Sequence, residues 1–462
     1  MKFPKDKCFL YFLLASFVFL ILKLFEMKFK FSDGFTYMYM GKMVLEGFVP
    51  YRDFFFASPP LQIYILAFAE LFSGGNFLIL KIIPIIATIG SGFFIYDYMK
   101  KKFGSRYGLV ASVLFLFSFL TLLTTDYSTG ISETMFFVLG MVYFAESGKP
   151  FIAGLFGSFA LLIRLYAPLP IAGTLLYYFI YRKKEILKFI LGVLTLFLPV
   201  SVIFELISHG AYLNQIFFFR LHLVSGIGLS KWSVVSFFLV GDIMLVLGSF
   251  LYFIFDKEKK SLFLPILATS FSVLLYIFYS DIYYLYFGLI IAFFAIFTTK
   301  FIFEFEGSSS FRKVLILAVM ILVIVNSSIY VADYASASNM PFTSSLVSFI
   351  KSNSLPNDTI YGNFQVAPLI SLLSGRSLAG NIADTNPKNI MTNTFTIKDV
   401  EDRISGVKFI IEKGNILSDG TLTGFDDSTP LNYMKSNCSL VKTYPVENDL
   451  NGNNFIGVWE CS

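Results

Sequence analysis

Long apolar stretches alternate with short charged segments from residue 8 to residue 332 of the chain. An α-helix needs roughly 20 apolar residues to cross the hydrocarbon layer of a bilayer. Eleven stretches approach this length, near residues 8–25, 77–98, 107–125, 131–147, 150–166, 168–181, 187–207, 233–255, 261–279, 282–300 and 314–332. The pattern predicts a polytopic α-helical membrane protein with about 11 transmembrane helices.

Composition agrees with a membrane environment. Apolar residues make up 56% of the chain and the mean hydropathy is +0.71, more than a soluble core can bury. The formal net charge is only +5, so a nucleic-acid partner is not indicated. The basic N-terminus and first apolar stretch resemble a signal peptide, but no small-x-small cleavage site follows. We therefore expect an uncleaved first span.

The basic residues decide the topology, because the segment 57–72 is also apolar and its status is ambiguous. If this segment does not cross the membrane, every basic cluster falls on one side, as the positive-inside rule expects. If it crosses, the cluster at 100–106 moves to the other side and the pattern fails. We therefore expect the N-terminus in the cytoplasm and residues 333–462 outside the cell membrane. The clusters are Lys2, Lys5 and Lys7, Lys100–Lys102 with Arg106, Lys149, Arg182–Lys184 with Lys188, Lys257, Lys259, Lys260, and Arg312 with Lys313.

A soluble domain is predicted after the last span, where Asn, Ser, Asp, Gly and Thr become frequent. We divide the chain into a membrane domain, 1–332, and a small extracytoplasmic α/β domain, 333–462. The expected elements are helices at 342–353 and 366–374 and strands at 358–362 and 407–412. Within the membrane domain, the outward loop 26–76 should consist of amphipathic pieces at the membrane interface, such as 35–47.

Two cysteines fall in the predicted outward domain, where disulfides are stable. The strand-like segment that begins with Cys438 and the one that ends with Cys461 flank a turn rich in Asn and Asp. Antiparallel pairing with Tyr444 opposite Phe455 would bring Cys438 opposite Cys461, so that a disulfide closes the hairpin. Two unpaired thiols are the alternative.

Acidic residues also gather on the predicted outer side. Asp33 and Asp53 follow the first span, and Asp126 and Glu133 lie around the turn before the fourth span. An acid at the start of an apolar helix is costly to bury, so it is usually retained for a partner or a reaction. The alternative for Glu133 is capping of its helix. For Asp33 it is an ordinary solvated acid.

These acids belong to a longer series of motifs along the chain. The series comprises Asp33, Tyr37, Gly47, Pro50, Tyr51, Arg52, Asp53, Pro59, Pro60, Glu133, Arg164 and residues 362–369, 374–376 and 381–384. It resembles the GT-C-type glycosyltransferases of the protein O-mannosyltransferase and lipid A aminoarabinose transferase kind. Two positions depart from the family pattern. Gly34 stands where many relatives have a second acid, and Ser58 stands where some have a lysine before Pro-Pro.

The resemblance implies a GT-C fold and an enzyme that transfers a sugar from a polyprenyl phosphate, of the dolichyl or undecaprenyl type. The acceptor, a protein, lipid or glycan, would be met on the outer face, with inversion at the anomeric carbon. Asp33 would be the catalytic base, and Glu133 the second catalytic acid. The leaving phosphate is a stable anion, so nearby positive charge suffices. The expected substrate-binding residues are Tyr37, Arg52, Asp53, Asp126, Arg164, Arg220 and His222.

Some of the basic residues have a structural alternative. Arg164 could be a snorkelling side chain at a helix end, and Arg220 and His222 could anchor a surface helix. No cofactor is expected, because the chain has only two histidines and no acid-x-acid pair near Asp33 on the outer side.

A second class of function stays open from the sequence. A lipid or solute transporter or flippase without transferase activity would also have many spans. Such proteins commonly carry internal repeats and polar residues at mid-membrane depth. Neither feature is clear in this sequence, so the transferase is favoured, with the lipid bilayer, the lipid-linked donor and an acceptor as its partners.

Overall fold

The computed structural model describes residues 6–219, 230–255, 259–278, 283–305, 309–337, 339–417, 419, 421–446 and 453–462. Contacts divide the chain into two units. The first comprises Met1–Met27, Lys81–Val202 and Gly228–Ala332, and the second comprises Lys28–Leu80, Ile203–Ile227 and Asp333–Ser462. Each unit is therefore assembled from three separate segments of the chain.

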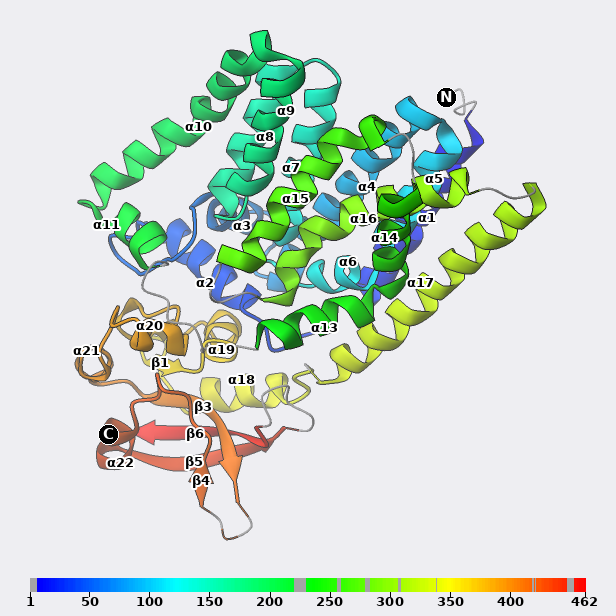
Figure 1. The fold of residues 1–462 in the computed structure, drawn as a ribbon. Coiled ribbons are helices and arrows are strands. Elements are labelled where there is room, and N and C mark those ends of the chain that lie inside the picture. Colours follow the sequence, from blue (N-terminus) through cyan, green and yellow to red (C-terminus); the bar gives the residue numbers. More distant parts are fainter. Residues whose placement is uncertain are drawn as a thin grey trace. The chain divides into compact units, whose positions relative to one another are not determined.

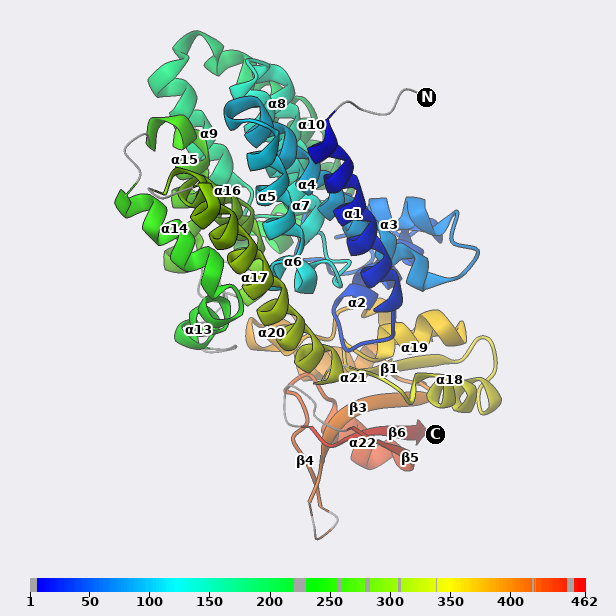
Figure 2. The same ribbon diagram turned by 90° about the vertical axis from the view of Figure 1, so that its right-hand side faces the viewer.

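The first unit is helical over its described residues (Figure 1). Its sequence explains this, since long apolar runs without β-turn signals satisfy their backbone groups most simply as helices in a bilayer. Among the helices, α1 lies beside α5 (Figure 2). The helices are α1 (Lys7–Phe25), α4 (Ile82–Phe103), α5 (Ser105–Leu116), α6 (Phe119–Thr124), α7 (Ile131–Glu146), α8 (Pro150–Ile163), α9 (Pro168–Tyr181), α10 (Ile186–Ile207), α13 (Lys231–Gly241), α14 (Ile243–Phe255), α15 (Phe263–Phe278), α16 (Gly288–Glu304) and α17 (Ser309–Ala337).

Several helices are long and apolar enough to cross a membrane. In the part of the chain that the structure describes there are five, or six if the bent pair α13 and α14 forms one span. The five are Lys7–Phe25, Phe77–Phe103, Lys183–Ile207, Tyr284–Glu304 and Lys313–Ala332. The chain is thus a multi-pass membrane protein, but the predicted count of eleven is not confirmed.

Two of the predicted spans are broken, and one carboxylate is common to both breaks. The stretch near 107–125 divides into α5 and α6, and the stretch near 233–255 divides into α13 and α14, which meet at 90°. Asp242, at the second break, accepts hydrogen bonds from the backbone N–H groups of Phe119 (2.8 Å) and Leu120 (3.0 Å) at the start of α6. These N–H groups have no intrahelical partner. The buried Asp242 side chain therefore satisfies backbone groups that the breaks leave without partners. Hydropathy alone does not reveal such a contact.

Basic loops gather at one end of the first unit. Lys102 Nζ lies 2.5 Å from Glu146 Oε2, and the guanidinium of Arg182 donates to the backbone carbonyl of Glu146. Lys100 Nζ lies 2.8 Å from Asp6 Oδ2, next to the start of α1. The loops that the positive-inside rule assigns to one side thus share an end. Which side of the membrane that end faces stays a prediction.

The second unit combines short helices with a mixed sheet. The helices are α2 (Gly34–Leu45), α3 (Leu61–Glu70), α11 (Ala211–Leu213), α18 (Thr343–Ser352), α19 (Ala367–Ser374), α20 (Pro387–Met391), α21 (Ile397–Arg403) and α22 (Leu431–Asn437), with a π-helical turn at Asn214–Phe218. The strands are β1 (Thr359–Gly362), β2 (Ser377–Leu378), β3 (Phe409–Ile416), β4 (Leu422–Thr423), β5 (Cys438–Pro445) and β6 (Phe455–Cys461). The α/β elements expected after the last span are confirmed.

The sheet has the strand order β2-β1-β3-β6-β5, and β4 pairs with β3. β1 is parallel to β2 and β3, whereas β6 is antiparallel to β3 and β5. The central strand β3 is buried along most of its length, and Ile410 on β3 belongs to a core with Tyr361, Ile404 and Trp459. The parallel strands thus lie at one side of the sheet, next to the helix α19 that packs on β1.

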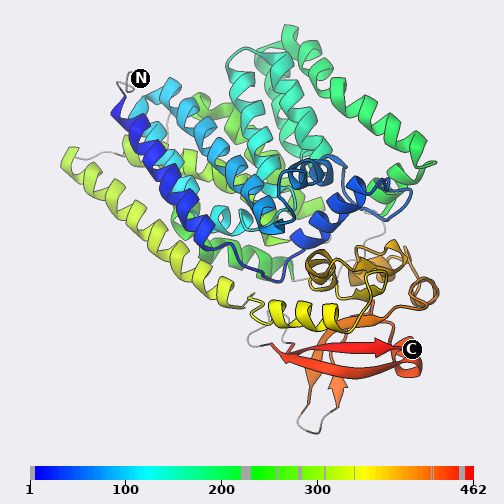
Figure 3. The same ribbon diagram turned by 180° about the vertical axis from the view of Figure 1, so that it is seen from behind.

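The C-terminal hairpin is formed by β5 and β6, side by side in Figure 3. Cys438 faces Cys461, and a disulfide joins them. The expected pairing of Tyr444 with Phe455 is wrong, since Tyr444 faces Ile456. A register shift between Leu440 and Lys442 inserts one extra residue into β5. This is a β-bulge, which moves every later pair by one position.

Helix α2 differs from the amphipathic helix expected at 35–47. Eight of its twelve residues are buried, so it has no continuous polar face. It packs against α3 and α19. Gly41 permits the close approach to α3, because a Cβ there would lie only 3.1 Å from the backbone nitrogen of Ala67. α2 is thus part of the core of the second unit.

The topology can be tested with single cysteines in a Cys8→Ser background. An impermeant maleimide applied to intact cells should label Asn353→Cys, an exposed position at the end of α18, but not Ser105→Cys or Lys184→Cys. The reason is that the basic loops should face the cytoplasm. All three should react after permeabilisation. Labelling at 105 in intact cells would contradict this topology and would restore 57–72 as a span.

Candidate active site

Asp33 lies immediately before α2 in the second unit. It is the N-cap residue of that helix, but its carboxylate makes no capping hydrogen bond to the helix. The N–H of Gly34 instead donates to Ser32 Oγ (3.0 Å). The side chain of Asp33 is half-buried. The carboxylate that the sequence predicts as the base thus lies partly exposed at the start of α2 and does not cap that helix.

The C-terminal domain holds α2 in position through two hydrogen bonds. Thr36 Oγ1 donates to the carbonyl of Phe364 (2.8 Å), and the N–H of Leu378 donates to the Tyr39 hydroxyl (2.9 Å). Gly362, at the end of β1, has φ +150°, and a Cβ there would lie 1.9 Å from the Ile411 carbonyl oxygen. Only glycine fits this position, and it lets the chain turn from β1 to the Phe364 carbonyl.

A second carboxylate, Asp384, lies near Asp33. Thr385 Oγ1 donates to the Gly362 carbonyl (2.7 Å). Asp384 is therefore held next to the turn after β1, whose Phe364 carbonyl bonds to α2. Asp384 Oδ1 accepts the N–H of Asn386 (3.0 Å). Burial, reinforced by the negative charge of Asp33, raises the pKa of Asp384 to about 6. In this chain Gly34 follows Asp33 directly, and the second carboxylate near Asp33 comes from the C-terminal domain.

Tyr37 joins α2 to the outward loop. Its hydroxyl lies 3.2 Å from Ser58 Oγ, and its ring meets Phe56 edge-on. Tyr51 donates its hydroxyl proton to the backbone carbonyl of Ser58 (2.7 Å). Ser58 therefore links the two tyrosines, through its hydroxyl to Tyr37 and through its backbone carbonyl to Tyr51.

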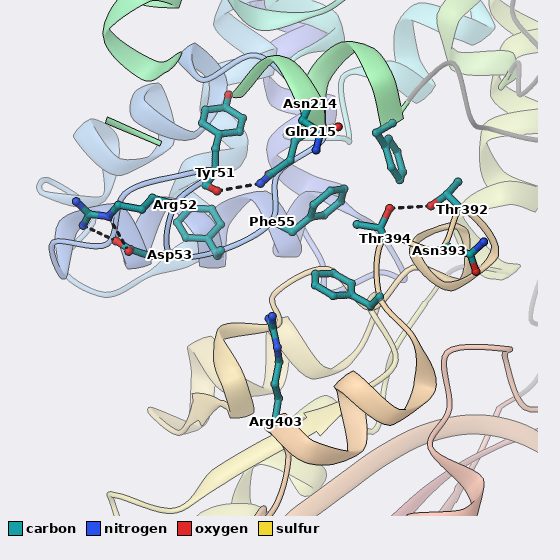
Figure 4. A pocket seen from close by; sticks show the side chains of 13 residues that line it. Tyr51, Arg52, Asp53, Phe55, Asn214, Gln215, Thr392, Asn393, Thr394 and Arg403 are labelled. Carbon is teal, nitrogen blue, oxygen red and sulfur yellow. Dashed lines mark hydrogen bonds and ion pairs between the residues drawn. The ribbon is translucent and has the colours of Figure 1, made fainter. Parts of the chain in front are cut away.

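Arg52 and Asp53 line a pocket in the second unit (Figure 4). Arg52 donates Nε–H and Nη2–H to the two carboxylate oxygens of Asp53, both at 2.8 Å. This bidentate bond from Arg52 holds the pKa of Asp53 below its usual range. The two predicted substrate-binding residues therefore largely neutralise each other.

Glu133 and Arg164 belong to the first unit, around the turn before α7. Glu133 lies in the first turn of α7 and is 3% exposed, where the helix dipole favours a negative charge. Arg164 is also buried, and its Nη2 donates to the carbonyl of Thr129 in that turn. Arg164 follows α8, and Glu133 is in the first turn of α7. The hydrogen bond from Arg164 to Thr129 therefore links the end of α8 to the turn before α7.

Asp126 has a structural partner that the sequence did not reveal. Lys23, on α1, is 1% exposed, and its Nζ lies 3.1 Å from Asp126 Oδ1 and 2.6 Å from Glu26 Oε2. A buried ammonium requires such counter-charges. The predicted substrate contact of Asp126 stays a prediction, but the ion pair explains its retention by itself.

The remaining predicted residues, Arg220 and His222, lie outside the described residues. Among the residues that the structure describes, no group of three or more His, Cys, Asp or Glu side chains could hold a metal ion. The motif at 381–384 includes Asp384 without giving it a role, and the sequence alone does not indicate Lys23, Asp242 or Arg403. Each of these residues can be recognised only from the neighbour that the fold places beside it.

Comparison with known proteins identifies the fold. No family model and no curated protein matches the chain by sequence. The structure is nevertheless similar to that of GT-C glycosyltransferases, the class that the motifs resemble. The chain thus has the GT-C fold.

Three solved structures illustrate the similarity. ArnT from Cupriavidus metallidurans, bound to undecaprenyl phosphate, has a TM-score of 0.64 and 12% identity, with 97% of each chain covered. The apo oligosaccharyltransferase of Archaeoglobus fulgidus has a TM-score of 0.57 and 12% identity, with 89% of this chain and 70% of that one covered. The mycobacterial arabinofuranosyltransferase AftD has a TM-score of 0.51 and 10% identity, with 97% of this chain but 41% of AftD covered.

The buried ion pair can be tested by stability. Lys23→Met should lower the free energy of unfolding by about 3–5 kcal/mol, because it leaves two carboxylates without their counter-charge. Thermal unfolding of the purified protein in detergent measures this, and Lys23→Met/Asp126→Asn should recover part of the loss. Lys42→Met, which breaks the more exposed pair with Glu46, should cost at most about 1 kcal/mol. Equal losses in the two lysine variants would contradict the buried pair.

The raised pKa of Asp384 predicts a pH dependence of stability. Between about pH 4 and pH 6 the folded state holds the proton that the unfolded state has released, so stability falls as pH rises. Asp384→Asn should abolish this fall, whereas Asp427→Asn, at an exposed acid of the same domain, should retain it. Unfolding midpoints at pH 4, 5, 6 and 7.5 give the comparison. Parallel profiles for wild type and Asp384→Asn would be evidence against the buried acid.

Proposed function

We propose that this protein is an inverting membrane glycosyltransferase that uses a polyprenyl-phosphate-linked sugar as donor. The observation that carries the proposal is the structural similarity to undecaprenyl-phosphate-bound ArnT over 97% of both chains, combined with Asp33 at the start of α2. The acceptor would be a protein, lipid or glycan on the outer face. Residues 1–332 would form the membrane domain and 333–462 the extracytoplasmic domain, with the N-terminus in the cytoplasm.

The reaction needs one proton acceptor. An acceptor hydroxyl attacks the anomeric carbon as the bond from that carbon to the phosphate oxygen breaks. The hydroxyl proton passes to the Asp33 carboxylate, and the bonding electrons leave with the polyprenyl phosphate. Because the phosphate departs as a stable anion, no general acid is required. The carboxylate of Asp384 lies near Asp33, close enough for the charge of Asp33 to contribute to the raised pKa of Asp384.

The donor phosphate requires positive charge, and its lipid chain requires apolar surface. Among the predicted cations, Arg164 is the candidate with the most restricted geometry, because its side chain is buried and bonded to the Thr129 carbonyl. Arg52 is less suited, since Asp53 already neutralises it. Glu133, in the first turn of α7, would orient the donor or Arg164 rather than move a proton.

Removal of the base should abolish most turnover. Asp33→Asn keeps the size of the side chain but not its basicity, so kcat should fall about 100-fold or more while donor binding persists. Glu133→Gln should lower turnover less. Arg164→Ala should weaken donor binding, because its phosphate partner is present in ground and transition states alike. The assay incubates purified protein with radiolabelled polyprenyl-phosphate sugars and measures released polyprenyl phosphate.

A matched control comes from the other end of α2. Glu46→Gln removes an acid that is half exposed and paired with Lys42, and it should leave turnover unchanged. An Asp33→Asn protein that transfers sugar at the wild-type rate would remove the mechanism and leave only the fold. A wild-type protein that releases no polyprenyl phosphate with any donor would favour the transporter alternative.

A further inference from the structure

A polar cavity of about 410 Å³ lies within the second unit (Figure 4). This volume is within the roughly 300–1,000 Å³ typical of ligand sites. Three distant parts of the chain line the cavity: the loop 51–55, the π-helical turn with Phe219, and the connection 392–395 with Arg403. None of the residues assigned to the transfer step, Asp33, Glu133 or Arg164, is among the lining, so the step leaves this cavity unexplained.

The wall formed by the loop is held in an uncommon backbone conformation. Tyr51 has φ +69°, which a bulky residue adopts only when its surroundings require it. Gln215, in the π-helical turn, fixes it from both sides: its Nε2 donates to the Tyr51 carbonyl and its Oε1 accepts the N–H of Phe56, both at 2.9 Å. The twist at Tyr51 directs the following residues along the cavity.

The opposite wall joins two short helices. Asn393 follows the C-cap of α20 and has φ +56°, a conformation that asparagine tolerates after a helix. Thr396 then begins α21 with a capping box formed with Asp399. The two fixed ends leave Thr394 and Phe395 between them, facing the cavity.

Aromatic rings and neutral polar groups alternate around the cavity. Phe55 meets Phe219 edge-on at 5.2 Å and Phe395 at 5.6 Å. Asn214 and Thr394 supply an amide and a hydroxyl. Sugar rings offer polarised C–H faces to aromatic rings and hydroxyl groups to amides, so this mixture suits a carbohydrate better than an apolar ligand.

The side chains that line the cavity carry one more positive charge than negative charges. Arg52 is neutralised by Asp53. Arg403, at the end of α21, lies over the Phe395 ring at 5.2 Å. Asp399, one turn earlier on α21, interacts with its charge, but none of the carboxylates in the described ranges forms an ion pair with it. Two arginines and one aspartate give the lining a formal charge of +1. A guanidinium that rests on a ring with its donors unpaired suits a carboxylate or phosphate.

We propose that this cavity binds the acceptor as an acidic glycan, with a sugar ring against the Phe55 and Phe395 rings and its anionic group on Arg403. The assignment of the glycan as acceptor rests on the proposed transferase function, whereas the binding site itself does not. Carboxylate and phosphate share the chemistry that Arg403 recognises, and the test separates them.

The experiment measures binding without donor or turnover. Three disaccharides with one scaffold are titrated calorimetrically into the purified full-length protein in nanodiscs: cellobiose, cellobiouronic acid and cellobiose 6′-phosphate. At least one acidic probe should bind about 10-fold more tightly than cellobiose, the difference expected for a charge-assisted hydrogen bond. Which acidic probe binds identifies the anionic group.

Variants locate the binding. Arg403→Gln should lower the affinity for the acidic probe to that for cellobiose. Lys398→Gln, which removes the same charge from an exposed position of α21, should leave the affinity for the acidic probe unchanged. Phe395→Leu should weaken the binding of all three probes several-fold, and Glu46→Gln, which changes a side chain outside the cavity lining, should bind them as the wild type does. Equal affinity for all probes, no binding of any, or equal effects of the Arg403 and Lys398 variants would overturn the proposal. A protein that binds the acidic probe through Arg403 but releases no polyprenyl phosphate would instead refute the transferase function.

Discussion

The arrangement of the candidate active site depends on how helix α2 is held by residues that come more than three hundred positions later. The hydroxyl of Thr36 bonds to the Phe364 carbonyl, and the Tyr39 hydroxyl receives the N–H of Leu378. Each bond alone contributes only about 1 kcal/mol. Their importance is geometric, since they fix the rotation of α2 about its axis and hence the direction of Asp33. Asp384 follows the same turn, so one contact region orients both acids.

The buried charges of the first unit have a different character. Asp242 caps α6, and Lys23 is held between Asp126 and Glu26. In each case the partners satisfy the charge within the unit, so that these groups stabilise breaks and turns of the helices. An intramembrane or buried acid in such a protein is therefore not by itself a sign of catalysis, and its partners have to be known first.

Sequence reasoning worked where a local pattern determines the structure. Hydrophobic runs identified the membrane class, and Gly375 after the helix at 366–374, together with the strand-like segments at 358–362 and 407–412, identified the C-terminal elements. It failed where one distant side chain decides the outcome. Asp242 divides two apolar stretches that hydropathy counts as spans, and one extra residue in β5 shifts the hairpin register.

In the candidate site, too, the residues that a local pattern marks could be predicted, and those that depend on distant neighbours could not. Asp33 and Tyr37 could be found because they are four residues apart on one helix, which a family motif preserves. Asp384 falls in the motif at 381–384 but receives no role from it, and Arg403 falls in no motif. The tertiary fold supplies the neighbours that give these residues a role, Asp33 for the first and Phe395 for the second. Linear motifs do not report which residues the fold brings together.

The discontinuity of the second unit also constrains the order in which the protein can be made. Residues 28–80 leave the ribosome early, but the segments that receive α2 begin only at 333. At about 5–20 residues per second, roughly fifteen seconds to a minute of synthesis separates the two. During that interval the buried face of α2 lacks its partner α19, while the helices of the first unit from α4 onward are still being made. The second unit can therefore complete its core only after the segment that carries α19 has been synthesised.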